Sequence, residues 1–121
     1  LTDAGRRSGD AAIATALGRS TAPFVRPVDG APTAGQLRDA GPAGWTWAIG
    51  WDVDPRDDLD PGAGGPIAAD IVARVASRAS GGSIVRLRLT GPRTLEALPG
   101  IVEALAARGL AIVPLDEVLG R

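Results

Sequence analysis

Apolar residues recur every three or four positions in two stretches of the chain, which is the spacing of helices that bury one face. In residues 66–80 the repeat consists of Ile67, Ile71, Val75 and Ala79. In residues 94–109 it consists of Leu98, Ile101, Val102 and Leu105. The pattern therefore predicts two amphipathic helices, and the second should be capped by Thr94 and ended by Gly109.

Shorter helices are predicted elsewhere in the chain. Residues 10–17 have helical spacing and end before Gly18, whereas residues 1–9 show no period and are expected to be an irregular amino-terminal segment. Residues 33–41 begin with Thr-x-x-Gln, the spacing of a capping box, and predict a helix of about two turns. Residues 115–119 predict a final helical turn.

Apolar runs of strand length separate these helices, at residues 23–26, 45–51, 83–89 and 110–113. In the third run, Arg86 and Arg88 share the face opposite Val85 and Leu87. Helical patterns on both sides make this the expected central strand, so both guanidinium groups should be partly enclosed. Enclosed guanidinium groups need carboxylate partners or water, and the acidic loop at residues 52–58 is the expected source of those partners.

Alternation in residues 45–51 puts Trp45, Trp47, Ile49 and Trp51 on one face of a strand. One interpretation is that this face packs against helices as part of the core. The other is that one or more of the tryptophans forms a platform on which a sugar ring stacks.

The order of predicted elements alternates between helices and strands, with short connections, which indicates an α/β fold with a parallel sheet and right-handed crossovers. In such folds, function collects in the loops at the carboxyl ends of the strands. These loops and the central strand carry the candidate site residues Arg26, Asp29, Asp52, Asp54, Asp57, Asp58 and Arg88. The expected organisation is one α/β domain over residues 10–121.

Composition excludes several kinds of site. The chain has no histidine and no cysteine, so it lacks thiolate metal sites, His-containing zinc sites and the commonest general acid/base. A net charge of −1 argues against broad binding to nucleic acid or to an anionic membrane. No apolar run has the length of a membrane span. Because the chain opens with Leu1, we expect a processed product or part of a longer protein.

Four segments, at residues 24–31, 51–58, 82–88 and 94–119, occur in an order and spacing that are typical of one family. The first resembles the Arg-Pro-Pro-Tyr-Gly segment of the polysaccharide deacetylases (carbohydrate esterase family 4, the NodB homology domain). The second is similar to that family's Trp strand leading into Asp-x-x-Asp-Trp, and the third to Gly-Ser-Ile-Val-Leu-Leu-His. The last resembles the closing helix, strand and turn. The resemblance implies the carboxyl-terminal half of a deformed (β/α) barrel.

The resemblance also implies roles for particular residues. By this resemblance, Arg26 would position the catalytic base and Asp57 would orient a catalytic histidine. At the position of that histidine this chain has Arg88. Asp29 stands in place of a tyrosine, and Asp58 in place of a pocket tryptophan. The family's zinc or other divalent metal is held by an acidic motif and a His-x-x-x-His motif, which this chain lacks, so no metal ligand and no cofactor is assigned to it.

Three interpretations of function stay open. The chain is a catalytically degenerate deacetylase-like domain that acts as a carbohydrate-binding or structural module. Alternatively, it is the carboxyl-terminal part of an active metal-dependent N-acetylglucosamine deacetylase, or an α/β interaction domain unrelated to sugars. In the first interpretation, Asp57 or Asp58 forms an ion pair with Arg88, and the binding residues are Asp29, Trp51, Asp54 and Asp58.

The partners expected from the sequence are a glycan and either a second copy of the chain or an upstream domain that completes the barrel, because half a barrel leaves strand edges exposed. Binding to nucleic acid and insertion into a membrane are not expected. By resemblance alone, the location would be extracytoplasmic.

Overall fold

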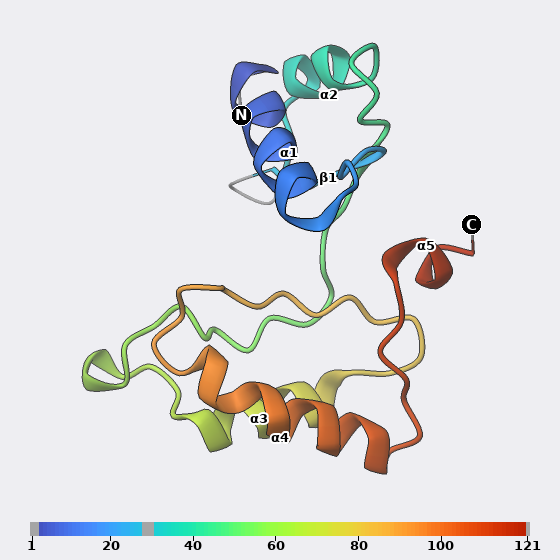
Figure 1. Ribbon diagram of the computed structural model, residues 1–121. Helices are drawn as coiled ribbons and strands as arrows, with labels where there is room; N and C mark the ends of the chain where they lie inside the picture. Colours follow the sequence, from blue (N-terminus) through green and yellow to red (C-terminus); the bar gives the residue numbers. More distant parts are fainter. Residues whose placement is uncertain (1–2, 28–30, 121) are drawn as a thin grey trace. The chain divides into compact units, whose positions relative to one another are not determined.

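The structure is a computed structural model that describes residues 3–27 and 31–120. The chain forms two compact units, Leu1–Gly50 and Trp51–Arg121, and each is considered by itself below. Figure 1 labels their helices and strands. Among the described residues, no helix combines the length and apolar character needed to cross a membrane.

The amino-terminal unit contains two helices and a small parallel sheet. Its elements are α1 (Asp3–Leu17), β1 (Phe24–Val25), α2 (Ala34–Ala40) and β2 (Trp47–Ala48). β1 pairs with β2 in parallel, with Phe24 opposite Trp47 and Val25 opposite Ala48. Parallel pairing of strands separated by a helix confirms the α/β class that the sequence predicts.

The start of α1 corrects one prediction. Residues 3–9 are helical and not irregular, and the helix expected from residue 10 begins at Asp3. The reason is tertiary, because Arg6 is buried and its guanidinium carbon lies 6.0 Å from the centroid of the Trp45 ring. Contact with a distant aromatic residue stabilises a segment whose two glycines disfavour a helix. The end of α1 is as predicted, since Gly18 has a φ of 72°.

The capping box predicted for α2 is confirmed. The Gln36 N–H donates to Thr33 Oγ1 over 3.1 Å, and the Thr33 N–H donates to Gln36 Oε1 over 2.9 Å. Each side chain therefore satisfies a backbone N–H that the first turn of the helix leaves without a partner.

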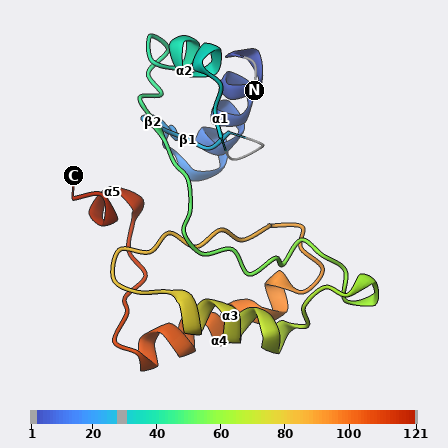
Figure 2. The same ribbon diagram turned by 180° about the vertical axis from the view of Figure 1, so that it is seen from behind.

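The carboxyl-terminal unit is built on a pair of packed helices. Its elements are the 3₁₀ turn η1 (Pro61–Ala63), α3 (Ala68–Arg78), α4 (Thr94–Ala107) and α5 (Leu115–Val118). Figures 1 and 2 show α3 and α4 side by side from opposite directions. Their shared core consists of Ile71, Val75, Ala79, Ala97, Ile101 and Leu105.

The buried face of α4 differs from the predicted stripe. Leu98 and Val102 are 38% and 50% exposed, and Ala97 lies in the core in their place. Gly100 lies on the face of α4 that meets Val72 of α3, and a Cβ atom added there would lie 2.9 Å from Val72 Cγ2. The glycine therefore lets the Val72 side chain pack against α4 without having to shift.

Two of the predicted strands are not regular strands in the described chain. Residues 83–89 contribute a single parallel bridge, between Val53 and Val85, and residues 110–113 have no strand assignment. The bridge is held by the Arg86 N–H, which donates to the Val53 carbonyl over 2.9 Å. A ladder of so few residues is marginal without a further strand beside it, so strong β-propensity does not suffice to make an extended sheet here.

Candidate functional site

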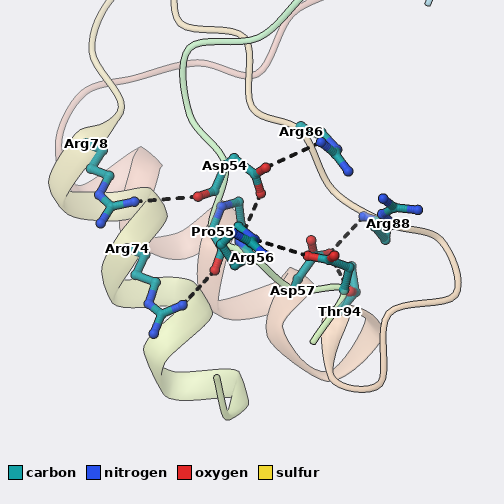
Figure 3. A network of polar contacts seen from close by, with 10 residues as sticks. Asp54, Pro55, Arg56, Asp57, Arg74, Arg78, Arg86, Arg88 and Thr94 are labelled. Carbon is teal, nitrogen blue, oxygen red and sulfur yellow. Dashed lines mark hydrogen bonds and ion pairs between the residues drawn. The ribbon is translucent and has the colours of Figure 1, made fainter. Parts of the chain in front are cut away.

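The predicted site residues fall into different parts of the molecule. Six of them lie in the carboxyl-terminal unit, on the loop that starts at Trp51 and on the segment at residues 84–88: Trp51, Asp52, Asp54, Asp57, Asp58 and Arg88. Figure 3 shows this loop between α3, the start of α4 and the segment that carries Arg86 and Arg88.

Two further candidates lie outside this group. Arg26 belongs to the amino-terminal unit, where its Nε donates to the Ile49 carbonyl over 3.4 Å and its Nη2 to the Gly50 carbonyl over 3.3 Å. Its guanidinium therefore fastens the main chain after β2. Asp29 is outside the described residues.

Asp57 is the most enclosed of the candidates that the structure describes, with 2% of its surface exposed. Its Oδ2 accepts hydrogen bonds from the Arg88 N–H over 2.8 Å and from Thr94 Oγ1 over 2.5 Å. A buried carboxylate is costly unless fixed donors satisfy it, and these two donors do so from separate segments. Asp57 therefore ties its own loop to the segment at 84–88 and to the first turn of α4.

Gly91 leaves the space that the Thr94 side chain needs to reach Asp57. A Cβ atom added at Gly91 would lie 2.7 Å from the Asp57 carbonyl oxygen and closer still to Thr94 Oγ1. The turn before α4 thus has to be glycine for Thr94 to reach Asp57. The sequence predicted Thr94 as the cap of this helix, which is wrong, because the N-cap is Arg93 and Thr94 is the first residue of α4. The bond from Thr94 to Asp57 was not predicted, because the two residues are 37 positions apart.

The ion pair expected between Arg88 and Asp57 or Asp58 does not form. Arg88 contributes its backbone N–H to Asp57, while its exposed side chain has no hydrogen bond or ion pair with any described residue. Asp58 instead lies 3.6 Å from Arg56. Because the backbone N–H and the side chain of an extended residue point in different directions, the contact with Asp57 leaves the guanidinium in water.

Arg86 forms the contact with a carboxylate that the sequence predicted for an arginine of this segment. Its Nη1 lies 3.4 Å from Asp54 Oδ2, and its guanidinium carbon lies 4.5 Å from the centroid of the Trp51 ring. Asp54 also accepts from the Arg56 N–H over 2.9 Å, which holds the loop in a tight turn. One face of Trp51, the predicted sugar platform, is therefore covered by a cation.

Two arginines of α3 fix the opposite side of the loop. Arg74 donates to the Pro55 carbonyl over 2.9 Å, and Arg78 approaches the Asp54 carbonyl at 3.5 Å (Figure 3). Arg56 adopts a φ of 59°, a left-handed conformation that is uncommon for a residue with a side chain. These contacts hold the loop in one shape and place its carboxylates against the segment at 84–88.

The tryptophans do not share one buried face. Trp45 is buried and its Nε1 donates to Thr21 Oγ1 over 3.4 Å, whereas Trp47 is 41% exposed. Regular alternation fails because β2 comprises only Trp47–Ala48, so the pleat does not continue to Trp51. The core interpretation thus holds for Trp45 and fails for Trp47.

The residues present do not fit the zinc that the family resemblance implies. Carboxylate oxygens of Asp54, Asp57 and Asp58 lie within 4.8 Å of one another. However, the chain supplies no histidine or cysteine, which zinc prefers as ligands, and Asp57 Oδ2 is already occupied by two donors. No chemical step is therefore assigned to a metal in this chain.

Asp52 anchors the segment at 84–88 from the exposed side. Its Oδ1 accepts a hydrogen bond from the Ile84 N–H over 2.6 Å. This bond, followed by a bond from the Ser83 hydroxyl, lowers the pKa of Asp52 below its ordinary value of 3.8. A lowered carboxyl pKa means that the ionised form favours the folded state.

We expect the substitution Asp52→Asn to destabilise the protein at neutral pH and to lose its effect in acid. The stabilisation from a carboxylate with a depressed pKa is fully present above the unfolded value, near 3.8, and disappears as the pH falls through the folded value. Urea unfolding midpoints of both proteins, measured from pH 7 to pH 2, test this. A difference in midpoint that does not shrink below pH 4 would contradict the assigned role of the charge.

The fold is similar to those of a solved carbohydrate esterase and two solved deacetylases. It matches a family 4 carbohydrate esterase from Streptomyces lividans in complex with acetate at a TM-score of 0.71 and 28% identity, over 95% of this chain and 58% of that one. It matches a deacetylase solved with substrate at a TM-score of 0.77 and 25% identity, over 99% and 57% of the two chains. A polysaccharide deacetylase from Bacillus cereus matches at 0.67 and 21%, over 86% and 52%.

These similarities are structural. No protein-family model matches the chain, and no curated protein matches it in sequence. The chain spans between 52% and 58% of the lengths of the three solved proteins. The chain therefore has a polysaccharide deacetylase-like α/β fold, of which it contains somewhat more than half.

Proposed function

We propose that this chain is a polysaccharide deacetylase-like domain that has lost hydrolysis and acts as a carbohydrate-binding or structural module. The observation that carries this proposal is the environment of Asp57. At the position where the resemblance places an aspartate that orients a histidine, the carboxylate instead bonds the Arg88 N–H and the Thr94 hydroxyl. Asp57 thus has a structural role in joining loops.

Arg88, which stands where the family has a catalytic histidine, supports the same conclusion. A guanidinium stays protonated at all pH values at which proteins are folded, so Arg88 cannot exchange a proton with a leaving group near neutral pH. The other family-equivalent residue, Arg26, donates to two main-chain carbonyls. None of the three family-equivalent positions therefore supplies acid/base chemistry in this proposal.

The test is to incubate the purified chain with N-acetylglucosamine oligomers and added zinc, and to measure acetate release and bound metal, beside an active polysaccharide deacetylase as positive control. We expect no acetate and no stoichiometric zinc, together with measurable binding of the oligomers by calorimetry. Turnover with stoichiometric zinc would overturn the proposal and identify a working deacetylase. Absence of both turnover and glycan binding would exclude the carbohydrate-binding role and leave a structural module or an interaction domain unrelated to sugars.

A further inference from the structure

We propose that residues 110–113 form a dimerisation edge, along which two copies of this chain pair antiparallel about a two-fold axis at Ile112. This inference goes beyond the proposed function and does not depend on it. The dimerisation edge has the sequence Leu-Ala-Ile-Val and joins α4 to α5 in the carboxyl-terminal unit (Figure 1). Its residue types favour a strand, yet no described segment pairs with it.

The main chain of the dimerisation edge has hydrogen-bond donors without protein acceptors. The N–H groups of Ala111, Ile112 and Val113 make no hydrogen bond with any described residue. Ile112 is 66% exposed, so this part of the main chain is accessible to another molecule. An unpaired run of β-forming residues is a template for a strand from another chain.

An apolar hollow of about 650 Å³ lies beside the dimerisation edge in the same unit. Its lining is mostly aliphatic and includes Val85, Leu87, Leu98, Val102, Leu110 and Ile112. Leu98 and Val102 come from α4 but stay outside the core that α4 shares with α3. Because a strand presents alternate side chains to one face, apolar side chains of a paired strand can enter this hollow and cover it.

The sequence around the dimerisation edge identifies a second copy of the chain as the partner. A two-fold interface uses the same surface on both subunits, so that surface has to complement itself. Residues 109–115 carry no charge, whereas Arg108 and Asp116 bound them, each four positions from Ile112. Antiparallel pairing about Ile112 therefore brings Arg108 of each copy to the end where the other copy has Asp116.

The charges at both ends are available for this pairing. Arg108 donates through Nη1 to the neutral carbonyls of Ala76 and Ala79 and has no ion pair with a described residue. Asp116 accepts the Glu117 N–H through Oδ1 and likewise has no ion pair in the described part of the chain. Glu117 lines the hollow and adds a second negative charge at that end. The ends are thus opposite in charge and without counter-ions.

The first test is the oligomeric state of the whole chain, measured by sedimentation equilibrium across micromolar concentrations. We expect a monomer–dimer equilibrium without larger species, because a two-fold interface is closed. Ile112→Asp should raise the dissociation constant more than about tenfold, since it places two carboxylates beside each other at the axis. A monomer at every concentration, or a dimer that Ile112→Asp leaves unchanged, would overturn the proposal.

Leu89→Asp is the matched control. Leu89 is fully exposed in the same unit and does not line the hollow, so the same added charge should leave the dissociation constant unchanged. Equal weakening by Leu89→Asp and Ile112→Asp would show a general effect of charge on association and would contradict the assigned surface.

Charge reversal at the two ends tests the antiparallel arrangement. Asp116→Arg and Arg108→Glu each place like charges at both ends of a homodimer, so each variant should dimerise more weakly than the unmodified chain. Their equimolar mixture should form the heterodimer, in which opposite charges meet at both ends. No preference for the heterodimer between variants with unchanged far-UV circular dichroism would overturn the arrangement.

A second comparison needs no change at Arg108, whose bonds to α3 contribute to the fold. Asp116→Asn removes the opposite charge without adding a like charge, so it should weaken the dimer less than Asp116→Arg does. Equal dissociation constants for these two variants would also count against the pairing of Arg108 with Asp116 of the partner subunit.

Discussion

Replacing Asp57 by alanine is expected to lower the free energy of unfolding by about 3 kcal/mol, because two hydrogen bonds to a buried side chain are lost together. Asp57 is 2% exposed, and its Oδ2 receives both the Arg88 N–H and the Thr94 hydroxyl. Alanine would leave both donors without their partner where little water enters. Chemical denaturation followed by tryptophan fluorescence measures the loss.

Asp58→Ala is the control for that substitution. Asp58 is the next residue along the loop, its side chain is 28% exposed, and its recorded ion pair with Arg56 is long, at 3.6 Å. Exposed ion pairs contribute little, so its removal should change the free energy of unfolding by about 0.5 kcal/mol or less.

A double-mutant cycle with Thr94→Val separates the hydrogen bond from general loop damage. Valine keeps the shape of threonine and removes only the hydroxyl that donates to Asp57 over 2.5 Å. The two substitutions together should cost clearly less than the sum of the single effects. Additive effects, or equal losses in Asp57→Ala and Asp58→Ala, would refute the role assigned to Asp57.

Ile71→Ala is expected to lower the free energy of unfolding by about 4 kcal/mol, because it empties part of the interface between α3 and α4. Ile71 is 0% exposed and lies in the cluster that includes Val75, Ala97, Ile101 and Leu105. The close approach of the helices at Gly100 limits how far they can shift to fill the cavity. The same denaturation experiment measures this loss.

Ile67→Ala is the control, because it makes the same change of side chain at an exposed position of the same repeat. Ile67 belongs to the same apolar repeat, precedes Ile71 by one turn and is 54% exposed. Its substitution should change the free energy of unfolding by about 0.5 kcal/mol, as for other exposed positions. If both isoleucine variants lost the same stability, the helix pair would not pack along the face described here.

Much of the local structure could be predicted from the sequence. The repeat at residues 66–80 predicted α3, Thr33 and Gln36 predicted the capped start of α2, and alternation of helices with strands predicted a parallel sheet. These features depend on residues within about one turn of each other, so their physical cause is present in the local sequence. The order of the family-like segments also predicted the fold that the solved deacetylases share.

The predictions that were wrong concern contacts between distant segments. The central strand became a single bridge, Leu98 and Val102 stay partly exposed, and residues 3–9 are helical, with Arg6 beside Trp45. In each case a neighbour remote in sequence decided the outcome. Propensity and periodicity do not report which neighbour that is.

For the candidate site, the sequence by itself determined which chemical groups are present: a chain without histidine, an acidic loop, and arginines on the segment at 84–88. Only the tertiary structure decided how they combine. Asp57 and Arg88 are 31 positions apart and meet through the backbone N–H of Arg88, while Arg86 takes Asp54 and Trp51. The direction in which each backbone presents its N–H and its side chain fixes these pairings, and that direction exists only after the segments have packed.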